Sequence, residues 1–158
     1  MSPVYFDTEL FLPVDIQLAW EFFSSARNLT LITPPELGFR IVRLPGPEIF
    51  EGMVIDYTVT PFFGIPLRWK TEIASVLEPY QFVDRQLNGP YKIWEHTHTF
   101  IEKKGGVLVH DRVRYQLPFG VLGHLVDSVV VRRKIENIFS YRKRVLQKIF
   151  NGNGSLHN

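Results

Sequence analysis

The segment 121–150 most constrains the fold, because it has the pattern of one long amphipathic helix close to the end of the chain. It contains no proline, and its only glycine is Gly123. A stripe of positions recurs at steps of three and four residues, as on one face of an α-helix. The stripe consists of Val131, Ile135, Ile138, Phe139, Arg142, Val145, Leu146 and Ile149. A helix of this length would extend about 45 Å, and its stripe must be buried against another part of the chain.

The part of the chain before this helix has the pattern of an antiparallel sheet. A first strand is predicted over 4–12, and Asp15 is placed to cap a helix that follows it. A second short helix is predicted over 27–32, ending before two prolines. Segments with strand-like alternation, separated by Pro and Gly turns, follow at 39–44, 53–61, 67–77, 81–87, 94–100 and 109–115.

This order of elements predicts an α+β helix-grip fold, in which a curved antiparallel sheet of about seven strands surrounds the long C-terminal helix. We expect one domain over 1–150 and a flexible tail over 151–158, since 158 residues suit a single core. A net charge of +2 is too small to indicate a nucleic-acid partner. The chain has no cysteine, no apolar run long enough to span a membrane and no signal-peptide pattern. We therefore expect a cytoplasmic monomer or weak homodimer without stable membrane insertion.

Two neighbouring strand segments, WEHTHTF at 94–100 and VHDRVRY at 109–115, carry an unusual polar set on one face. The loop Lys104-Gly105 between them is typical of a hairpin and sets the register of the pair. Counting outward from this loop, the predicted pairs are Phe100 with Val109, His98 with Asp111, His96 with Val113, and Trp94 with Tyr115. One face of the sheet therefore combines apolar side chains with imidazoles, a carboxylate, a phenol and an indole, as expected for the wall of a ligand pocket.

We accordingly expect a cavity between the sheet and the long helix, of the usual size of about 300–1,000 Å³. Its ligand would be a small hydrophobic molecule, such as a lipid, a polyketide or an aromatic compound. The side chains expected to contact the ligand are Tyr57, Trp69, Thr71, Asp84, Trp94, His96, His98, Phe100, Asp111, Val113 and Tyr115.

The same polar groups allow other interpretations. His98 and Asp111 could act as a base and its orienting carboxylate, with Tyr115 donating to a developing oxyanion, as in a cyclase or dehydratase. His96 and His98 could instead bind a metal together with Asp111, or the Asp–His pair could simply join two strands. We favour a binder without metal or cofactor, because no complete catalytic signature is present and two histidines in an H-x-H pair are a weak metal motif.

Three further expectations concern the orientation of side chains. Alternation along 67–77 places Leu77 on the same inner face as Trp69 and Ile73. A tight turn after Glu78 would place Asp84 opposite Ser75. An inward Asp84 would contact the ligand or pair with an arginine, and an outward Asp84 would simply be solvated. The basic triplets 132–134 and 142–144 are expected on the solvated flank of the long helix.

The chain resembles the SRPBCC superfamily, which includes START lipid-transfer domains, birch-pollen allergen-like proteins and polyketide cyclases. Within it, the chain is most similar to a bacterial group of ligand-binding SRPBCC domains. The segments that carry the resemblance are TPPELGF at 33–39, WKTEI at 69–73, FVDRQLNGPY at 82–91, WEHTHTF at 94–100 and DRVRYQLPFG at 111–120.

The resemblance covers nearly the whole chain and implies the helix-grip fold with a hydrophobic cavity between sheet and helix. Members of the superfamily bind lipids, sterols, polyketides or hormones, and some catalyse cyclisation or dehydration in the cavity. One departure is clear, because Pro45-Gly46-Pro47-Glu48 stands where the pollen-allergen branch has a glycine-rich loop.

Overall fold

One antiparallel sheet organises the protein, which we describe from a computed structural model over residues 2–62, 64–118 and 130–151. Within these residues the sheet has seven strands in the order β1-β7-β6-β5-β4-β3-β2. The strands are β1 (Val4–Leu12), β2 (Arg40–Arg43), β3 (Val54–Phe62), β4 (Ile65–Leu77), β5 (Gln81–Asn88), β6 (Ile93–Lys103) and β7 (Gly106–Gln116). The helices are α1 (Ile16–Ser24), the 3₁₀ turns η1 (Ala26–Thr30) and η2 (Pro35–Leu37), and α3 (Arg132–Asn151).

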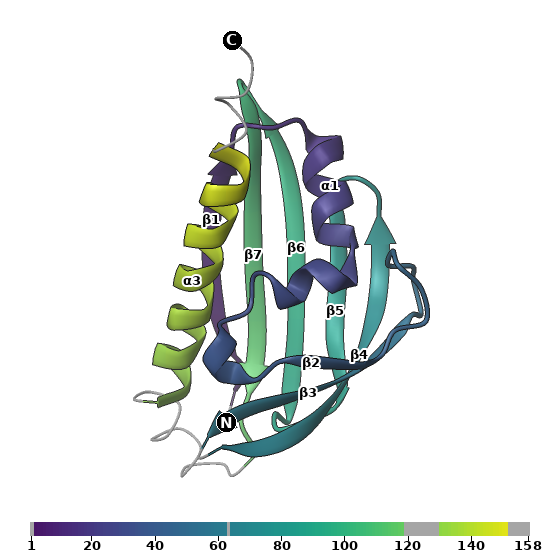
Figure 1. Ribbon diagram of the computed structural model, residues 1–158, viewed down its shortest axis with the longest axis vertical. Helices are drawn as coiled ribbons and strands as arrows, with labels where there is room; N and C mark the ends of the chain where they lie inside the picture. Colours follow the sequence, from purple (N-terminus) through teal and green to yellow (C-terminus); the bar gives the residue numbers. More distant parts are fainter. Residues whose placement is uncertain (1, 63, 119–129, 152–158) are drawn as a thin grey trace.

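The sheet curves strongly, so that β5, β6 and β7 run along the molecule while β2 and β3 run across it (Figure 1). The helices α1 and α3 both cover its concave face, with α3 beside β1 (Figure 1). The helix α1 contacts β6 and β7. This is the predicted helix-grip architecture. The part of the predicted long helix at 121–129 lies outside the described residues.

The helix α1 begins where the sequence predicts. The Leu18 N–H donates a hydrogen bond to Asp15 Oδ1 at 2.8 Å, so Asp15 is the N-cap. The second predicted helix is a 3₁₀ turn over Ala26–Thr30 rather than an α-helix, and the turn η2 follows it. Gly38 ends η2 in the left-handed region at φ 54°, which glycine adopts without the strain of a Cβ atom.

A core of aromatic rings joins α1 to the sheet. Trp20 of α1 packs edge-on against both Phe82 and Phe100, with ring centroids 5.8 Å apart in each pair. Leu146 and Phe150 of α3 belong to the same buried cluster. This packing closes one end of the space between sheet and helices. Among the described helices, none combines the length and apolar character that crossing a membrane requires.

A β-bulge in β4 overturns two of the orientations expected from strict alternation. Ile73 pairs with Asp84 and Ser75 pairs with Val83, so one extra residue lies between them. Asp84 is therefore opposite Ile73 rather than Ser75. Beyond the bulge the inner face passes to Val76, which packs against the core, while Leu77 points outward and is 63% exposed.

Alanine substitutions on β4 test this bulge. We expect Ile73→Ala to lower the free energy of unfolding by about 2–5 kcal/mol, because Ile73 is buried among apolar side chains. Leu77→Ala should change it by less than about 0.5 kcal/mol, because the side chain is on the surface. Urea unfolding of both variants measures the difference, and similar losses in the two would contradict the bulged register.

Candidate functional site

A cavity of about 480 Å³ lies between the concave face of the sheet, the turns η1 and η2, and the helix α3. Strands β3 to β6 provide one wall, including Ile55, Tyr57 and Trp69. The helix α3 provides the opposite wall with Ile135, Ile138 and other residues of its inner stripe. Leu29 and Ile32 cover the cavity from the segment that follows α1. Most of the lining is apolar, and its polar groups are confined to a few positions.

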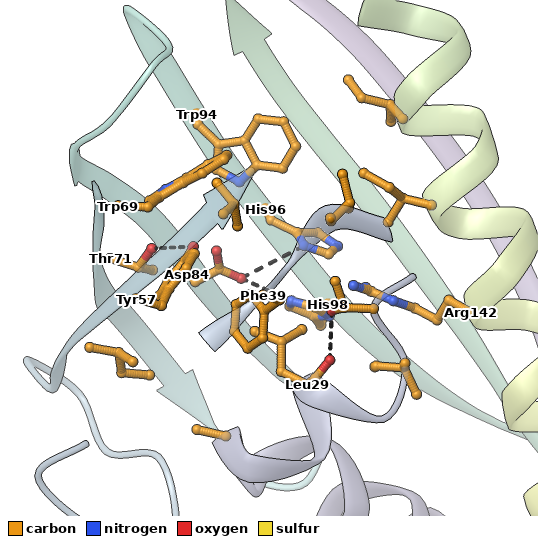
Figure 2. Close-up of a pocket in the computed structure, with 18 of the residues that line it drawn as sticks. Leu29, Phe39, Tyr57, Trp69, Thr71, Asp84, Trp94, His96, His98 and Arg142 are labelled. Carbon is orange, nitrogen blue, oxygen red and sulfur yellow. Dashed lines mark hydrogen bonds and ion pairs between the residues drawn. The ribbon is translucent and has the colours of Figure 1, made fainter. Parts of the chain in front are cut away.

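Aromatic rings form the wall near β3, β4 and β6 (Figure 2). Tyr57 and Trp69 are stacked with centroids 5.7 Å apart, and Trp94 meets Trp69 edge-on at 5.3 Å. The Tyr57 hydroxyl and Thr71 Oγ1 are hydrogen-bonded at 2.8 Å. Burial, together with the nearby negative charge of Asp84, raises the pKa of Tyr57, so its hydroxyl keeps its proton.

Four side chains on three adjacent strands form a group that we call the carboxylate–histidine cluster: Asp84 on β5, His96 and His98 on β6, and Asp111 on β7. His96, His98 and Asp111 are buried, and Asp84 is half-buried. The members of the cluster face the same side of the sheet because Asp84 pairs with His96 and His98 pairs with Asp111. The predicted register of the β6–β7 hairpin is confirmed at every pair from Trp94–Tyr115 to Phe100–Val109.

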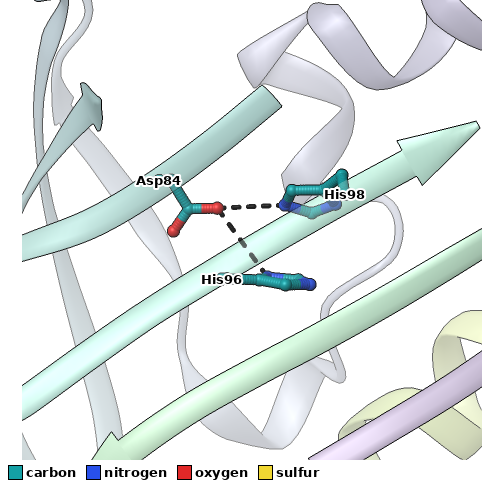
Figure 3. A group of neighbouring side chains, drawn as sticks. All are labelled: Asp84, His96 and His98. Atoms are coloured by element: carbon teal, nitrogen blue, oxygen red, sulfur yellow. Dashed lines mark hydrogen bonds and ion pairs between the residues drawn. The ribbon is translucent and has the colours of Figure 1, made fainter. Parts of the chain in front are cut away.

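Each carboxylate of the cluster contacts both histidines. Asp111 Oδ1 is hydrogen-bonded to His96 Nε2 at 2.8 Å and lies 2.9 Å from His98 Nδ1, close enough for an ion pair but without hydrogen-bond geometry. On the other side, Asp84 Oδ2 is hydrogen-bonded to His98 Nε2 at 3.0 Å and lies 3.7 Å from His96 Nδ1 (Figure 3). Asp84 thus pairs with histidines rather than with an arginine, and it also lines the cavity, as expected for a ligand contact.

The pKa values of the two histidines are shifted in opposite directions. Burial alone would lower the pKa of His98, but the close contact with Asp111, the hydrogen bond with Asp84 and the negative charge of both carboxylates raise it overall. Burial lowers the pKa of His96, and the charge of His98 lowers it further, despite the carboxylates. Since the two ring centroids are only 3.7 Å apart, the arrangement favours one cationic imidazole, at His98.

The same contacts keep Asp111 ionised. Burial alone would raise its pKa, but the hydrogen bond from His96, the close contact with His98 and the positive charge on the histidine pair hold the pKa of Asp111 far below its ordinary value. A neutral His96 then carries its proton on Nε2, where it donates to Asp111.

The residues that could offer metal ligands differ from the expected set. Among the described residues, one oxygen of Asp84 and one nitrogen each of His96 and His98 lie within 4.8 Å of one another, and Asp111 is not part of this group. The two imidazole planes are inclined by only 36°, so their in-plane lone pairs do not converge on one point between them. One ring would have to turn before both could bind the same ion, and the geometry does not favour a metal centre.

Arg142 is a further polar group of the cavity, and the sequence analysis did not place it there. It extends from α3 toward His98 (Figure 2), lines the cavity and is 7% exposed. Its guanidinium lies over the Phe139 ring at 4.8 Å. Burial lowers the pKa of Arg142, while the charges of Asp111 and Asp84 oppose the shift. The only signal in the sequence was an arginine at a position of the apolar stripe.

We expected both basic triplets on the solvated flank of the long helix, but two of their six residues are not exposed. Arg142 is buried, and Lys134 is half-buried at the cavity wall, where its ammonium group donates to the Pro61 carbonyl. The other four residues of the triplets are exposed, as predicted: Arg132, Arg133, Lys143 and Arg144.

The expected ligand contacts divide into two groups in the structure. Seven side chains line the cavity: Tyr57, Trp69, Thr71, Asp84, Trp94, His96 and His98. The other four are buried but are not among its lining residues: Phe100, Asp111, Val113 and Tyr115. Tyr115 packs against Val131, Ile135 and Phe139 of the long helix segment, so its ring belongs to the core.

No family model matches the chain, and no curated protein matches its sequence. Solved structures do share its fold. The di-domain ARO/CYC protein StfQ from the steffimycin biosynthetic pathway has a TM-score of 0.72 at 15% identity, over 98% of this chain and 53% of StfQ. Ginseng major latex-like protein 151 from Panax ginseng has a TM-score of 0.68 at 15% identity, over 95% of this chain and 99% of that protein.

Protein Ms6760 from Mycobacterium smegmatis is similar to the same degree, with a TM-score of 0.68 at 16% identity, over 94% of this chain and 92% of that protein. These similarities show that the chain has the helix-grip fold, a curved seven-stranded sheet with a long C-terminal helix. This is the fold that the resemblance to the SRPBCC superfamily implies.

Replacing Asp111 by Asn tests the electrostatics of the carboxylate–histidine cluster. The pKa of His98 should fall in Asp111→Asn, because the carboxylate that does most to raise it is lost. Because the pKa of Asp111 is lowered on folding, its ionised carboxylate stabilises the fold at pH values above about 4, which is the ordinary pKa of aspartate. The raised pKa of His98 contributes stability that is complete below about pH 6.5 and is lost as the pH rises through the raised value.

The free energy of unfolding should therefore differ most between wild type and Asp111→Asn from about pH 4 to 6.5, by about 1–3 kcal/mol. NMR titration of the imidazoles and urea unfolding across this range measure the two effects. Asp7→Asn is the matched control, because Asp7 pairs with His110 and Arg112 on the exposed face and should matter by less than about 1 kcal/mol. An unchanged pKa for His98 in Asp111→Asn would contradict the assignment.

Proposed function

We propose that this protein binds a small hydrophobic molecule in the cavity between its sheet and α3. The observation that carries the proposal is the cavity itself, about 480 Å³ of mostly apolar space with a few polar groups on its wall. Pockets for small molecules usually have about 300–1,000 Å³ and the same mixture of groups. The resemblance to the SRPBCC superfamily points to the same kind of ligand.

The energetics of packing support a binding role over a purely structural one. A void in a protein core lowers the free energy of unfolding by about 24 cal/mol per Å³. Because the net stability of a whole domain is only about 5–15 kcal/mol, a large void costs a substantial part of it. Apolar side chains line the space from β3, β4 and α3, and larger ones at a few of these positions would close it. A chain selected only for a stable core gains nothing from leaving this volume open.

The form of the cavity suits a ligand with a flat ring system. Tyr57, Trp69 and Trp94 present a broad aromatic surface at one wall, against which a polyketide or another aromatic compound would stack. Aliphatic residues on the other side, such as Ile135 and Ile138, would equally accept a lipid chain. We propose that the protein acts as a cytoplasmic carrier or receptor for such a molecule, as a monomer or weak homodimer without a metal or other cofactor.

A cyclase- or dehydratase-like activity is the second candidate, favoured by one feature of the wall. His98 lines the cavity between two carboxylates that stabilise its protonated form, so it could donate a proton to a bound ligand. The proposed partner Tyr115 does not line the cavity, which leaves the set incomplete. For an enzyme, Asp111→Asn would abolish turnover by orders of magnitude while binding survives; for a binder, affinity would change only modestly.

Filling the cavity tests the binding function. Val59 lines the cavity on β3 and is buried, so Val59→Trp should occupy ligand space and weaken binding at least about tenfold. Val42→Trp on β2 is the control, because Val42 is 67% exposed and its replacement should leave affinity unchanged. The neutral dye N-phenylnaphthylamine serves as the probe, with saturable change in dye and tryptophan fluorescence as the measurement. Equal binding by both variants, or no saturable binding by wild type, would refute the proposal.

A further inference from the structure

We propose that Arg142 is an anion-binding group inside the cavity and that the ligand is a hydrophobic acid whose carboxylate pairs with it. The inference rests on the proposed binding function and narrows it to one chemical class. The ligand's apolar body would fill the space near Tyr57, Trp69 and Trp94, with its acid group at the α3 wall.

The position of Arg142 is the first reason. It belongs to the inner stripe of α3, near the buried side chains of Phe139 and Leu146, and only 7% of it is exposed. Arginine is almost never buried to this degree unless it is paired. Yet Nε and Nη1 of Arg142 make no hydrogen bond to any of the residues that the structure describes. Two strong donors on a buried cation that lines a cavity are thus left for a ligand to satisfy.

The nearby carboxylates do not fill this role. Asp84 and Asp111 act on Arg142 through their charge, but among the described residues neither forms an ion pair with it, and Asp111 Oδ1 and Asp84 Oδ2 contact His96 and His98 instead. With one cationic imidazole, the two carboxylates are balanced by His98 and Arg142, so the wall of the cavity carries no net negative charge that would repel an acid.

The shape of the guanidinium selects the kind of anion. Its planar fork of N–H donors matches the two oxygens of a carboxylate in a bidentate pair, and it is less strongly hydrated than an ammonium group. In Figure 2, Arg142 lies across the cavity from Trp69 and Tyr57, with the histidines between. This separation of a cationic end from an aromatic end fits an amphipathic acid rather than a neutral hydrocarbon or a sterol.

Two dyes with the same ring system separate this inference from the binding function itself. N-phenylnaphthylamine is neutral, and anilinonaphthalene sulfonate adds one oxyanion. Wild-type protein should bind both dyes, with the sulfonate the tighter ligand. In Arg142→Met the advantage of the sulfonate should fall by about tenfold to a hundredfold, as expected for a lost charge-assisted pair, while the neutral dye keeps its affinity. Arg144→Met is the matched control, since Arg144 lies exposed on the same helix.

Competition extends the test to carboxylates. Dodecanoate should displace the neutral dye from wild type at lower concentration than dodecanol, and this difference should vanish in Arg142→Met. Arg142→Gln serves as a second variant, and circular dichroism confirms that each variant is folded. If both variants keep the wild-type preference for the charged ligands, or Arg144→Met loses it equally, the assignment of Arg142 is wrong. If the neutral dye fails to bind wild type at all, the proposed function itself fails.

Discussion

Two carboxylates lie on the buried concave face of the sheet only because two histidines stand between them. An isolated buried charge would cost several kcal/mol, but Asp84 and Asp111 each contact both imidazoles. This arrangement depends on the register of three strands, since a slip of one residue would turn His96 and His98 to the outer face. The backbone pairing of these strands thus determines which charged groups lie on the inner face of the sheet. Among the described residues, Arg142 forms no ion pair with a carboxylate, which makes the arginine available to a ligand.

Much of the fold could be predicted from local patterns. The order of elements, the Asp15 cap and the β6–β7 register all follow from periodicity and turn composition, which act over short stretches of chain. The bulge after Ile73 could not be predicted in this way, because the position of an extra residue in a strand depends on the curvature of the sheet and on the pairing with the adjacent strand. Its effect is large for a local feature, since it reverses the side to which Leu77 points.

The candidate site was less accessible to sequence reasoning. His98 and Asp111 could be placed opposite each other from one hairpin. The bond between Asp84 and His98 instead joins β5 to β6, and the longer connection between these strands at 89–92 does not fix their register. Tyr115 shares the inner face and was expected in the cavity, yet the segment around Val131 and Ile135 covers it. Periodicity tells which face a side chain takes, whereas the distance between the packed layers decides whether that side chain lines a cavity or a core.

Arg142 shows why an exception to a pattern carries more information than the pattern. Six of the seven stripe positions in α3 are apolar, and an apolar residue at the seventh would pack without the cost of desolvating a cation. Replacing buried charges with hydrophobic residues is often neutral or stabilising, so fold stability alone gives no reason for an arginine there. Residues that lower the stability of the fold are expected at positions where function requires them. The hydrogen-bond donors that this buried guanidinium leaves unsatisfied among the described residues are therefore best explained by a ligand whose anionic group pairs with them, and the position of Arg142 places that group at the helix rather than at the aromatic wall.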